Sequence, residues 1–345
     1  MKTKFPLMFA AFFLLTGYTV RDLGTLPGGG ASVALAINNR GNVAGYAFNA
    51  AGVQRAMWWK PSSGVYLEIP TPVIPGSITH AADLNDFDVV VGRMGTSISP
   101  SHAFAWCPGC SLLDLGTTST HESRAFGINN ANDVVGQWVT PGTPPLVDAV
   151  KWPGASTTRV LMSGFGGRLD WCDAISDIPR AVGTSANLSR IRRAILWDGK
   201  KALNLGTLGG ANSFGRAFIV RAWPDPYFTQ TFVVGESEFP GGGFDTRAFL
   251  WTAWMMTDLG TLPGWYGSRA YGINKDLQIV GQAYDSPGGG NHRAVLWDST
   301  GIHDLNDLIS DPDWLLGVAY DINDAGQIVG HGTHKGTPRA FLLEP

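Results

Sequence analysis

The chain has 345 residues, 15% of them charged, and a formal net charge of −3. This charge, without any run of Lys or Arg, excludes a nucleic-acid-binding surface, which needs clustered basic side chains. The low charged fraction and the 45 glycines favour short strands joined by glycine-rich turns.

The N-terminus differs in composition from the rest of the chain. Lys2 and Lys4 begin it, and a largely apolar run spans Phe5 to Leu15. A cationic start followed by about 7–15 apolar residues is typical of a secretory signal, and a membrane span requires about 20. We therefore expect residues 1–18 to be a signal peptide. The protein would then be secreted, extracellular or periplasmic, with no membrane span after signal removal. The alternative is a buried N-terminal helix.

An apolar tetrapeptide led by Ala recurs seven times along the chain, at intervals of roughly 45 to 54 residues. Its last residues are Trp59, Trp106, Trp152, Trp197, Trp251, Trp297 and Leu343. A period of this length indicates that one supersecondary unit is repeated. The fifth copy is degenerate, because it carries inserted residues around 217–223 and lacks the Ile-Asn turn of the others.

The copy between Ser268 and Leu305 shows what the unit contains. Residues 268–273, 278–283, 293–297 and 302–305 are rich in β-branched and apolar side chains and are separated by turn residues. No window shows the apolar period of a helix. Four short antiparallel strands repeated seven times predict an all-β fold, a seven-bladed β-propeller of four-stranded blades. A linear β-solenoid would repeat at about 20–30 residues.

The phase of the repeat predicts how the ring closes. The segment from Val20 to Leu26 matches a fourth strand, whereas the segment from Arg339 to Leu343 matches a third. The last blade therefore lacks its outer strand, and the N-terminal strand would complete it and cover the open edges. We expect residues 19–345 to form one propeller domain closed in this way.

The repeat resembles the HAF-type bacterial extracellular repeat. The segments that carry the resemblance are Asp258–Leu262, Ala270–Asn274, Gln278–Gly281 and Arg293–Trp297, and the His-Ala-Phe triplet that names the family stands at His102–Phe104. The resemblance covers Val20 to Pro345 and implies an exported bacterial protein. It transfers no catalytic residue, because the family motif is structural. The chain departs from the family in having Arg rather than His before Ala in five copies.

Three cysteines are present, and two of them flank a Pro-Gly pair. In the stretch Cys107-Pro108-Gly109-Cys110 the central pair suits a type II β-turn, which brings the two thiols together. We expect a Cys107–Cys110 disulfide. The alternative, a redox pair, is less favoured because the flanks read as strands rather than as a helix start. Cys172 is expected to be buried, and no metal or cofactor is expected, since a zinc site needs four ligands.

Two recurring slots have structural interpretations. Arg precedes the third-strand Ala in five copies, and Asp recurs in the fourth strand. Because Arg293 would lie diagonally from Asp304, we expect in-blade ion pairs rather than a ring of cations that grips an anionic polymer. The recurring Trp is expected in the core between blades rather than in sugar stacking. The Asn-Asp turns are expected to be hairpin turns rather than Ca²⁺ sites.

Two sets of loops differ from copy to copy, and in a propeller both emerge on one face around the channel. They join the second strand to the third and each blade to the next, and function usually resides on variable loops held by a rigid scaffold. Aromatic residues with scattered polar groups suit carbohydrate or protein recognition. The candidate ligand-binding residues are Trp138, Trp171, Trp265, Tyr266, Tyr284, His331 and His334. The spacing of the two histidines also allows a metal pair, but without paired carboxylates we expect loop histidines.

Two functional hypotheses follow. The favoured one is an exported non-enzymatic binding or scaffold protein, a monomer, that recognises an extracellular carbohydrate or protein through the variable loops. The alternative is a propeller hydrolase or lyase acting on extracellular polysaccharide, which requires converging groups such as paired carboxylates or a Ser/His/Asp set. Loop carboxylates such as Glu122, Asp173 and Glu236 recur in no pattern. Two carboxylates about 5–10 Å apart at the mouth of the channel would favour the enzyme.

Overall fold

The computed structural model describes residues 17–71, 77–96, 100–116, 120–178, 180–199, 201–222, 229–241 and 245–345. The expected signal peptide, residues 1–18, therefore lies outside the described residues except for Gly17 and Tyr18. Among the described residues, no helix is long and apolar enough to cross a membrane.

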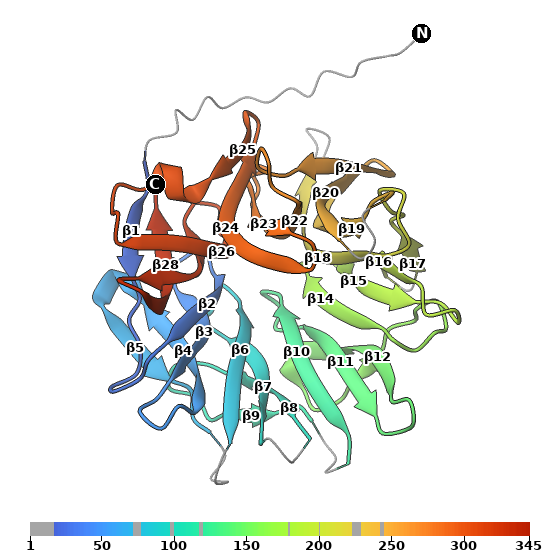
Figure 1. Ribbon diagram of the computed structural model, residues 1–345. Helices are drawn as coiled ribbons and strands as arrows, with labels where there is room; N and C mark the ends of the chain where they lie inside the picture. Colours follow the sequence, from blue (N-terminus) through green and yellow to red (C-terminus); the bar gives the residue numbers. More distant parts are fainter. Residues whose placement is uncertain are drawn as a thin grey trace.

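Seven four-stranded antiparallel sheets form the blades of a β-propeller, which confirms the predicted fold class (Figure 1). Blade 1 contains β2 (Ser32–Ile37), β3 (Val43–Phe48), β4 (Gln54–Lys60) and β5 (Val65–Glu68). Blade 2 contains β6 (Ile78–Leu84), β7 (Val90–Gly95), β8 (His102–Trp106) and β9 (Leu113–Asp114). Blade 3 contains β10 (Glu122–Ile128), β11 (Val134–Thr140), β12 (Leu146–Trp152) and β13 (Val160–Leu161).

The other four blades repeat this order. Blade 4 contains β14 (Trp171–Ile175), β15 (Arg180–Ala186), β16 (Arg192–Asp198) and β17 (Lys201–Asn204). Blade 5 contains β18 (Ser213–Ala222), β19 (Thr229–Glu238), β20 (Thr246–Thr252) and β21 (Met255–Gly260). Blade 6 contains β22 (Gly267–Ile273), β23 (Ile279–Ser286), β24 (Gly289–Asp298) and β25 (Gly301–Asp304). Blade 7 contains β26 (Trp314–Ile322), β27 (Ile328–His334), β28 (Thr337–Glu344) and the N-terminal β1 (Thr19–Asp22). Three short 3₁₀ turns are η1 (Pro61–Ser63), η2 (Pro153–Ala155) and η3 (Leu305–Leu308).

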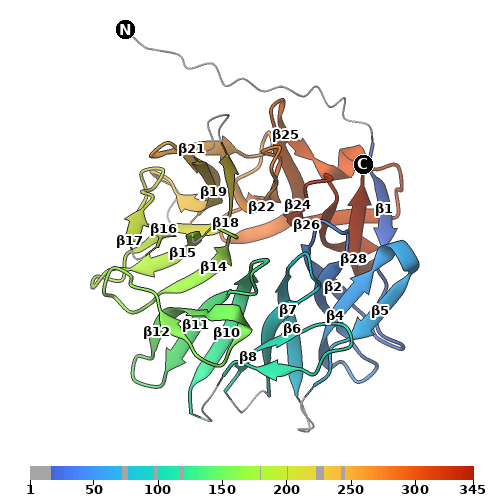
Figure 2. The same ribbon diagram turned by 180° about the vertical axis from the view of Figure 1, so that it is seen from behind.

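The N-terminal strand is the outer strand of the last blade. β1 runs antiparallel to β28, with Val20 opposite Leu343 and Asp22 opposite Phe341. Both ribbon views place β1 beside β28 (Figures 1 and 2). The first strands of successive blades contact one another around the whole ring, from β2 through to β26 and back to β2. The chain therefore has the pairing that the phase of its repeat predicts.

The core lies between neighbouring blades. The six recurring Trp side chains are at most 5% exposed, as expected for residues that fill the space between sheets. Between blades 6 and 7, for example, Val280 and Leu296 lie in one cluster with Leu316 and Phe341. The Trp repeat is thus a packing feature.

A chain of asparagine side chains joins the blades at the turns that follow their first strands. Each Nδ2 donates to the backbone oxygen of the equivalent residue in the next blade, at 3.0 Å in every case. The order is Asn274 to Asn323, Asn323 to Asn38, Asn38 to Asn85, Asn85 to Asn129, and Asn129 to Ser176. We call these contacts the asparagine links. They connect blades 6, 7, 1, 2, 3 and 4 in that order, and blade 5 has no such Asn.

The predicted in-blade ion pairs hold for part of the set. Arg293 Nε lies 3.8 Å from Asp304 Oδ2, and Arg339 Nε lies 3.7 Å from Asp22 Oδ2. Arg193 instead donates to the backbone oxygen of Ala211 in the next blade. The arginine before the third-strand Ala can therefore also join two blades, because its long side chain reaches beyond the edge of its own sheet.

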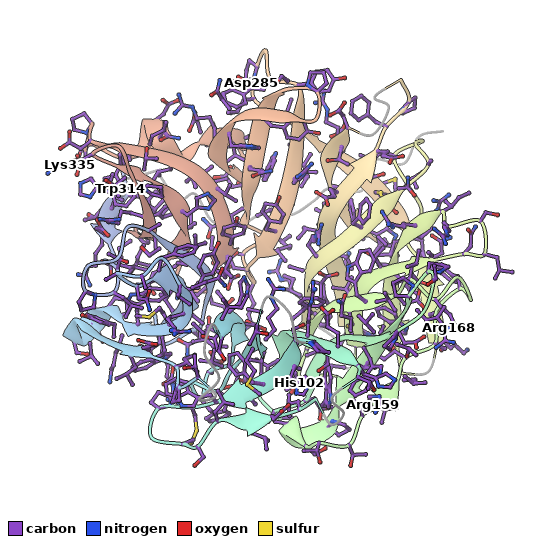
Figure 3. The ribbon with its side chains drawn as sticks, turned by 60° about the horizontal axis from the view of Figure 1, so that its bottom comes forward. His102, Arg159, Arg168, Asp285, Trp314 and Lys335 are labelled. Atoms are coloured by element: carbon purple, nitrogen blue, oxygen red, sulfur yellow. A yellow bond between two sulfur atoms is a disulfide. The ribbon has the colours of Figure 1, made fainter. Side chains whose placement is uncertain are left out.

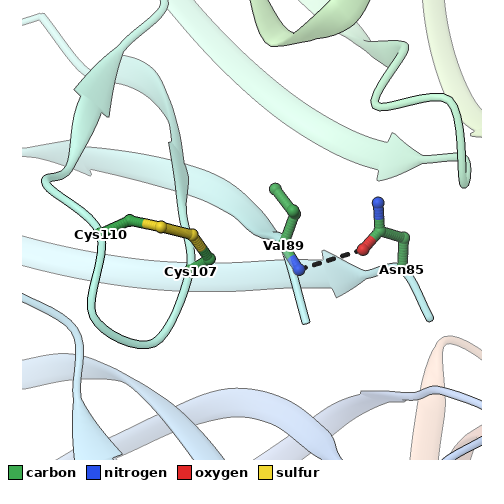
Figure 4. Close-up of a disulfide and its surroundings, with 4 residues drawn as sticks. All are labelled: Asn85, Val89, Cys107 and Cys110. Carbon is green, nitrogen blue, oxygen red and sulfur yellow. Dashed lines mark hydrogen bonds between the residues drawn. A yellow bond between two sulfur atoms is a disulfide. The ribbon is translucent and has the colours of Figure 1, made fainter. Parts of the chain in front are cut away.

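Cys107 and Cys110 form a disulfide in the hairpin between β8 and β9, with their Cα atoms 5.1 Å apart (Figure 4). The Cys110 amide donates to the Cys107 carbonyl at 2.9 Å, and Gly109 takes a φ of +82°, which few residues other than glycine adopt readily. Cys172 is free and buried.

Candidate functional site

A band of cross-strand pairs runs through the first and second strands of the blades, and the first strands lie nearest the centre of the ring (Figure 1). Each blade has an Ala, or an equivalent residue, in its first strand and a Gly in its second strand. The residue just before that Ala lies opposite the residue just after that Gly. The pairs are Val33–Tyr46, His80–Arg93, Arg124–Gln137, Trp171–Thr184, Phe214–Glu236, Arg269–Gln282 and Val318–His331. We call them the channel band. Most of these side chains are polar, and the band differs in every blade while the strands around it repeat.

A cleft of about 230 Å³ opens on this band between blades 2 and 3. It is bordered by the start of β6, the end of β7 and the start of β10, so it lies on the face that carries the variable loops. Its lining is Ile78, Thr79, His80, Arg93, Met94, Gly95, Thr96, Ser101, Glu122 and Arg124.

Hydrogen bonds fix the acidic group in the cleft. Glu122 Oε1 accepts from Arg124 Nε at 2.6 Å and from Ser101 Oγ at 2.9 Å, and Arg124 Nη2 also contacts this oxygen. Arg93 forms no ion pair within the part of the chain that the structure describes. Two guanidinium groups therefore share the cleft with one carboxylate.

The histidine in the cleft is neutral at physiological pH. Burial and the neighbouring charge of Arg93 lower the pKa of His80 to about 4, because both disfavour the charged imidazolium. Its ring lies 5.0 Å from that of Tyr46, centroid to centroid. The pKa of Arg93 is also lowered, first by burial and then by the charge of Arg124. With His80 neutral, the lining carries a net charge of about +1.

A second cluster lies on the other side of the channel and spans blades 4 to 6. Arg216 Nη1 lies 3.5 Å from Asp173 Oδ1, and its Nη2 donates to Glu236 Oε1 at 2.7 Å. Arg269 Nε lies 3.1 Å from Glu236 Oε2. Burial raises the pKa of Asp173 to about 7, against the lowering effect of Arg216. We call these four residues the ionic bridge.

The ionic bridge stands where the asparagine links stop. Asp173 belongs to blade 4, Arg216 and Glu236 to blade 5, and Arg269 to blade 6. Two carboxylates thus share one arginine, and paired carboxylates were the feature expected of a hydrolase. However, both carboxylates are ion-paired with Arg216, and Glu236 is also paired with Arg269. The cluster fits a structural role.

The aromatic residues predicted to bind ligand divide into two groups. Trp138 is 3% exposed and Tyr284 is 1% exposed, and the Tyr284 hydroxyl donates to the Thr246 carbonyl at 2.9 Å. These two side chains belong to the core. Trp171, Trp265 and Tyr266 are partly exposed but belong to blades 4 and 6 or the connection before them, away from the cleft. The structure does not bring the five together.

The prediction that placed His331 and His334 in a loop is wrong, because both lie in β27. Three positions apart on a strand, their side chains point to opposite faces. His331 belongs to the channel band and its ring lies 5.6 Å from that of Tyr320. His334 Nδ1 lies 2.9 Å from Asp22 Oδ2, and its ring stacks on Trp314 at 4.7 Å. His334 therefore helps to hold β1.

The variable loops do not converge on one point. Arg168, Asp285 and Trp314, which belong to the connection before blade 4, to blade 6 and to blade 7, are spread around the ring in Figure 3. Arg168 Nη2 contacts its local partner Asp148 at 2.6 Å. Across the described residues, no group of three or more His, Cys, Asp or Glu side chains is arranged to hold a metal ion. The cleft between blades 2 and 3, by contrast, brings basic, acidic and hydroxyl side chains together in one lining.

Sequence reasoning missed His80, Arg93 and Arg124. They lie in strands, whereas the candidate ligand-binding residues were sought among the loops. The signal was present, however, because each occupies a fixed slot beside a recurring residue, before the first-strand Ala or after the second-strand Gly. A position whose residue differs between repeats, while the residues beside it stay the same, is a candidate for ligand recognition.

Comparison with known proteins supports the fold alone. No protein-family model matches the chain, and no curated protein matches it in sequence. The chain superposes on a puromycin-hydrolysing peptidase from Mycobacterium tuberculosis with a TM-score of 0.56 at 10% identity. The superposition covers 88% of this chain and 50% of the peptidase, so this chain spans half of the peptidase. It superposes on the β-propeller domain of the Trilobed protease from Pyrococcus furiosus with a TM-score of 0.50 at 10% identity, over 79% of this chain and 80% of that one. The SapL1 lectin, solved with α-methyl fucoside, gives a TM-score of 0.42 at 13% identity, over 79% of this chain and 95% of that one.

Proposed function

We propose that this protein is an exported binding propeller that takes an extracellular ligand into the cleft between blades 2 and 3. The cleft carries the proposal, because it combines a concave shape with converging donors and acceptors on a rigid scaffold. The N-terminal composition and the resemblance to HAF-type repeats support export. The ionic bridge uses the paired carboxylates structurally, which supports binding over hydrolysis.

The proposal is tested by ligand screening with matched variants. The purified protein is screened against arrays of glycans and peptides, and hits are measured by calorimetry. We expect Arg93→Gln to weaken binding at least about tenfold, since hydrogen bonds to a charged group contribute about 1.5–3 kcal/mol. Lys335→Gln, on the rim of blade 7 (Figure 3), removes the same charge and should leave affinity unchanged. Equal affinities for the two variants would contradict the proposed site.

A further inference from the structure

The chemical class of the ligand can be inferred from the cleft, an inference that rests on the proposed function. Its volume of about 230 Å³ lies below the about 300–1,000 Å³ of sites for drug-sized molecules. The cleft therefore accommodates one small unit, such as a single sugar ring of a longer chain, and the rest of the ligand would extend over the loop face.

The charge of the lining selects an anion. Arg93 and Arg124 are opposed by Glu122 alone among the described lining residues, and His80 is neutral. The charge of Arg124 adds to the lowering of the pKa of Arg93 by burial. A ligand with one negative charge would relieve this repulsion in a half-buried setting, where screening by solvent is weak. A planar carboxylate matches the fork of a guanidinium and carries the single negative charge that the lining leaves unopposed.

The remaining lining selects hydroxyl groups next to that charge. Glu122 and Ser101 are already hydrogen-bonded to each other, with three contacts converging on Glu122 Oε1, so the carboxylate is fixed in place as an acceptor. The acidic side chain of a peptide would place its own carboxylate next to the carboxylate of Glu122. It would offer Glu122 no hydrogen-bond donor. In an acidic sugar the carboxylate and the hydroxyls leave different edges of the ring, so that both arginines and the acceptor can be satisfied.

We propose that the cleft between blades 2 and 3 binds a uronic acid unit of an extracellular polysaccharide, with Arg93 and Arg124 on the carboxylate side and Glu122 and Ser101 on the hydroxyl side.

Calorimetry on the full chain tests this inference with four probes: tetramers of galacturonic acid and of glucuronic acid, the methyl-esterified galacturonate tetramer, and a sulfated galactose tetramer. We expect at least one uronate to bind, and its neutral ester to bind at least tenfold more weakly. Arg93→Gln should lower uronate affinity at least tenfold, and Arg93→Lys, which keeps the charge without the fork, should lower it less. Lys335→Gln serves as the charge-matched control, and thermal melting checks that each variant is folded.

A second readout reports on the cleft itself. Because an anion beside the imidazole favours its charged form, uronate binding should raise the pKa of His80 in an NMR titration, with His80→Gln used for assignment. Equal binding of the uronate and its ester, with sensitivity to Arg93→Gln, would overturn the inference and leave the proposed function standing. Binding of the sulfated probe alone would also overturn it. If none of the four probes binds, the inference fails, and if the ligand screen is likewise negative the proposed function fails with it.

Discussion

The recurring Asn of the first turn performs two tasks with one side chain. Asn85 Oδ1 accepts from the amides of Phe87 and Val89, at 3.0 Å each, which shapes its own turn; the bond from Val89 is drawn in Figure 4. Its Nδ2 donates to the Asn129 carbonyl in the next blade. Asp offers only acceptors, and Ser donates and accepts through one oxygen atom, whereas Asn carries its acceptor and its donors on separate atoms that reach in different directions. This explains why Asn recurs where turn chemistry by itself would accept several residue types.

Two acidic residues at a neighbouring position predict pH-dependent stability. Asp321 Oδ2 accepts from the Ile37 amide at 2.9 Å, and Asp83 Oδ2 accepts from the Ile128 amide at 2.9 Å. Burial raises the pKa of Asp321 to about 7 despite the Ile37 bond, and the charge of Asp83 adds to the rise. Burial likewise raises the pKa of Asp83 to about 6. Each group therefore binds its proton more tightly in the folded state than in the unfolded one.

The stability of the protein depends on pH because the pKa of each carboxyl differs between the folded and the unfolded state. A raised pKa contributes stability that is fully present below the unfolded pKa of about 4 and is lost as pH rises through about 7. We expect the melting temperature of Asp321→Asn, relative to that of the native chain, to rise by several degrees between pH 5 and pH 8. Asp276→Asn, in an exposed turn, is the control and should show no such trend. A constant difference between Asp321→Asn and the native chain would contradict the assignment.

At the scale of the element, blade 5 shows how an irregular repeat is held in the ring. Its first two strands have 10 residues each, and it has no asparagine link. The ionic bridge connects it to both neighbours instead, through Arg216 to Asp173 and through Glu236 to Arg269. Charge-assisted hydrogen bonds are stronger than those between neutral groups, so these contacts hold the irregular blade firmly.

Arg216→Ala should destabilise the protein strongly, because it leaves two largely buried carboxylates without their shared partner. Removal of one member of a buried ion pair costs about 3–5 kcal/mol. Arg21→Ala, which breaks a surface pair with Glu344 at 3.6 Å, should cost at most about 1 kcal/mol. Thermal and chemical unfolding would measure both. Comparable losses for the two variants would show that the bridge does not join blades 4 to 6 energetically.

At the scale of the whole molecule, ring closure depends on a short strand. β1 pairs with β28, and Asp22 contacts both His334 and Arg339. A chain that begins at Leu23 would leave the edge of β28 unpaired and would remove the contacts of His334 and Arg339 with Asp22. We expect its melting temperature to fall by several degrees or more relative to a chain that begins at Gly17, since hidden edges close a propeller. Equal melting temperatures would mean that closure does not depend on β1.

The predictions that succeeded rest on patterns repeated along the chain. Trp297 and its equivalents recur at a fixed phase, and one interpretation, a core between sheets, satisfies all of them. The predictions that failed concern single residues. Tyr284 and His331 were assigned to loops because Gly and Pro follow or precede them, whereas β23 and β27 extend further than those signals suggest. Strand ends depend on pairing with a partner strand, which local sequence does not reveal.

The sequence by itself determined the number of blades, the order of their strands and the exchange of the outer strand between the termini, because each follows from a period and its phase. Only the tertiary structure decided where the cleft lies and what lines it. His80 and Arg93 come from one hairpin, but Glu122 and Arg124 come from the next blade, and their meeting depends on how two sheets pack. Contacts across blades join residues that are distant in the chain, such as Ser101 and Glu122, which are 21 positions apart, so no local pattern records which polar side chains will face one another.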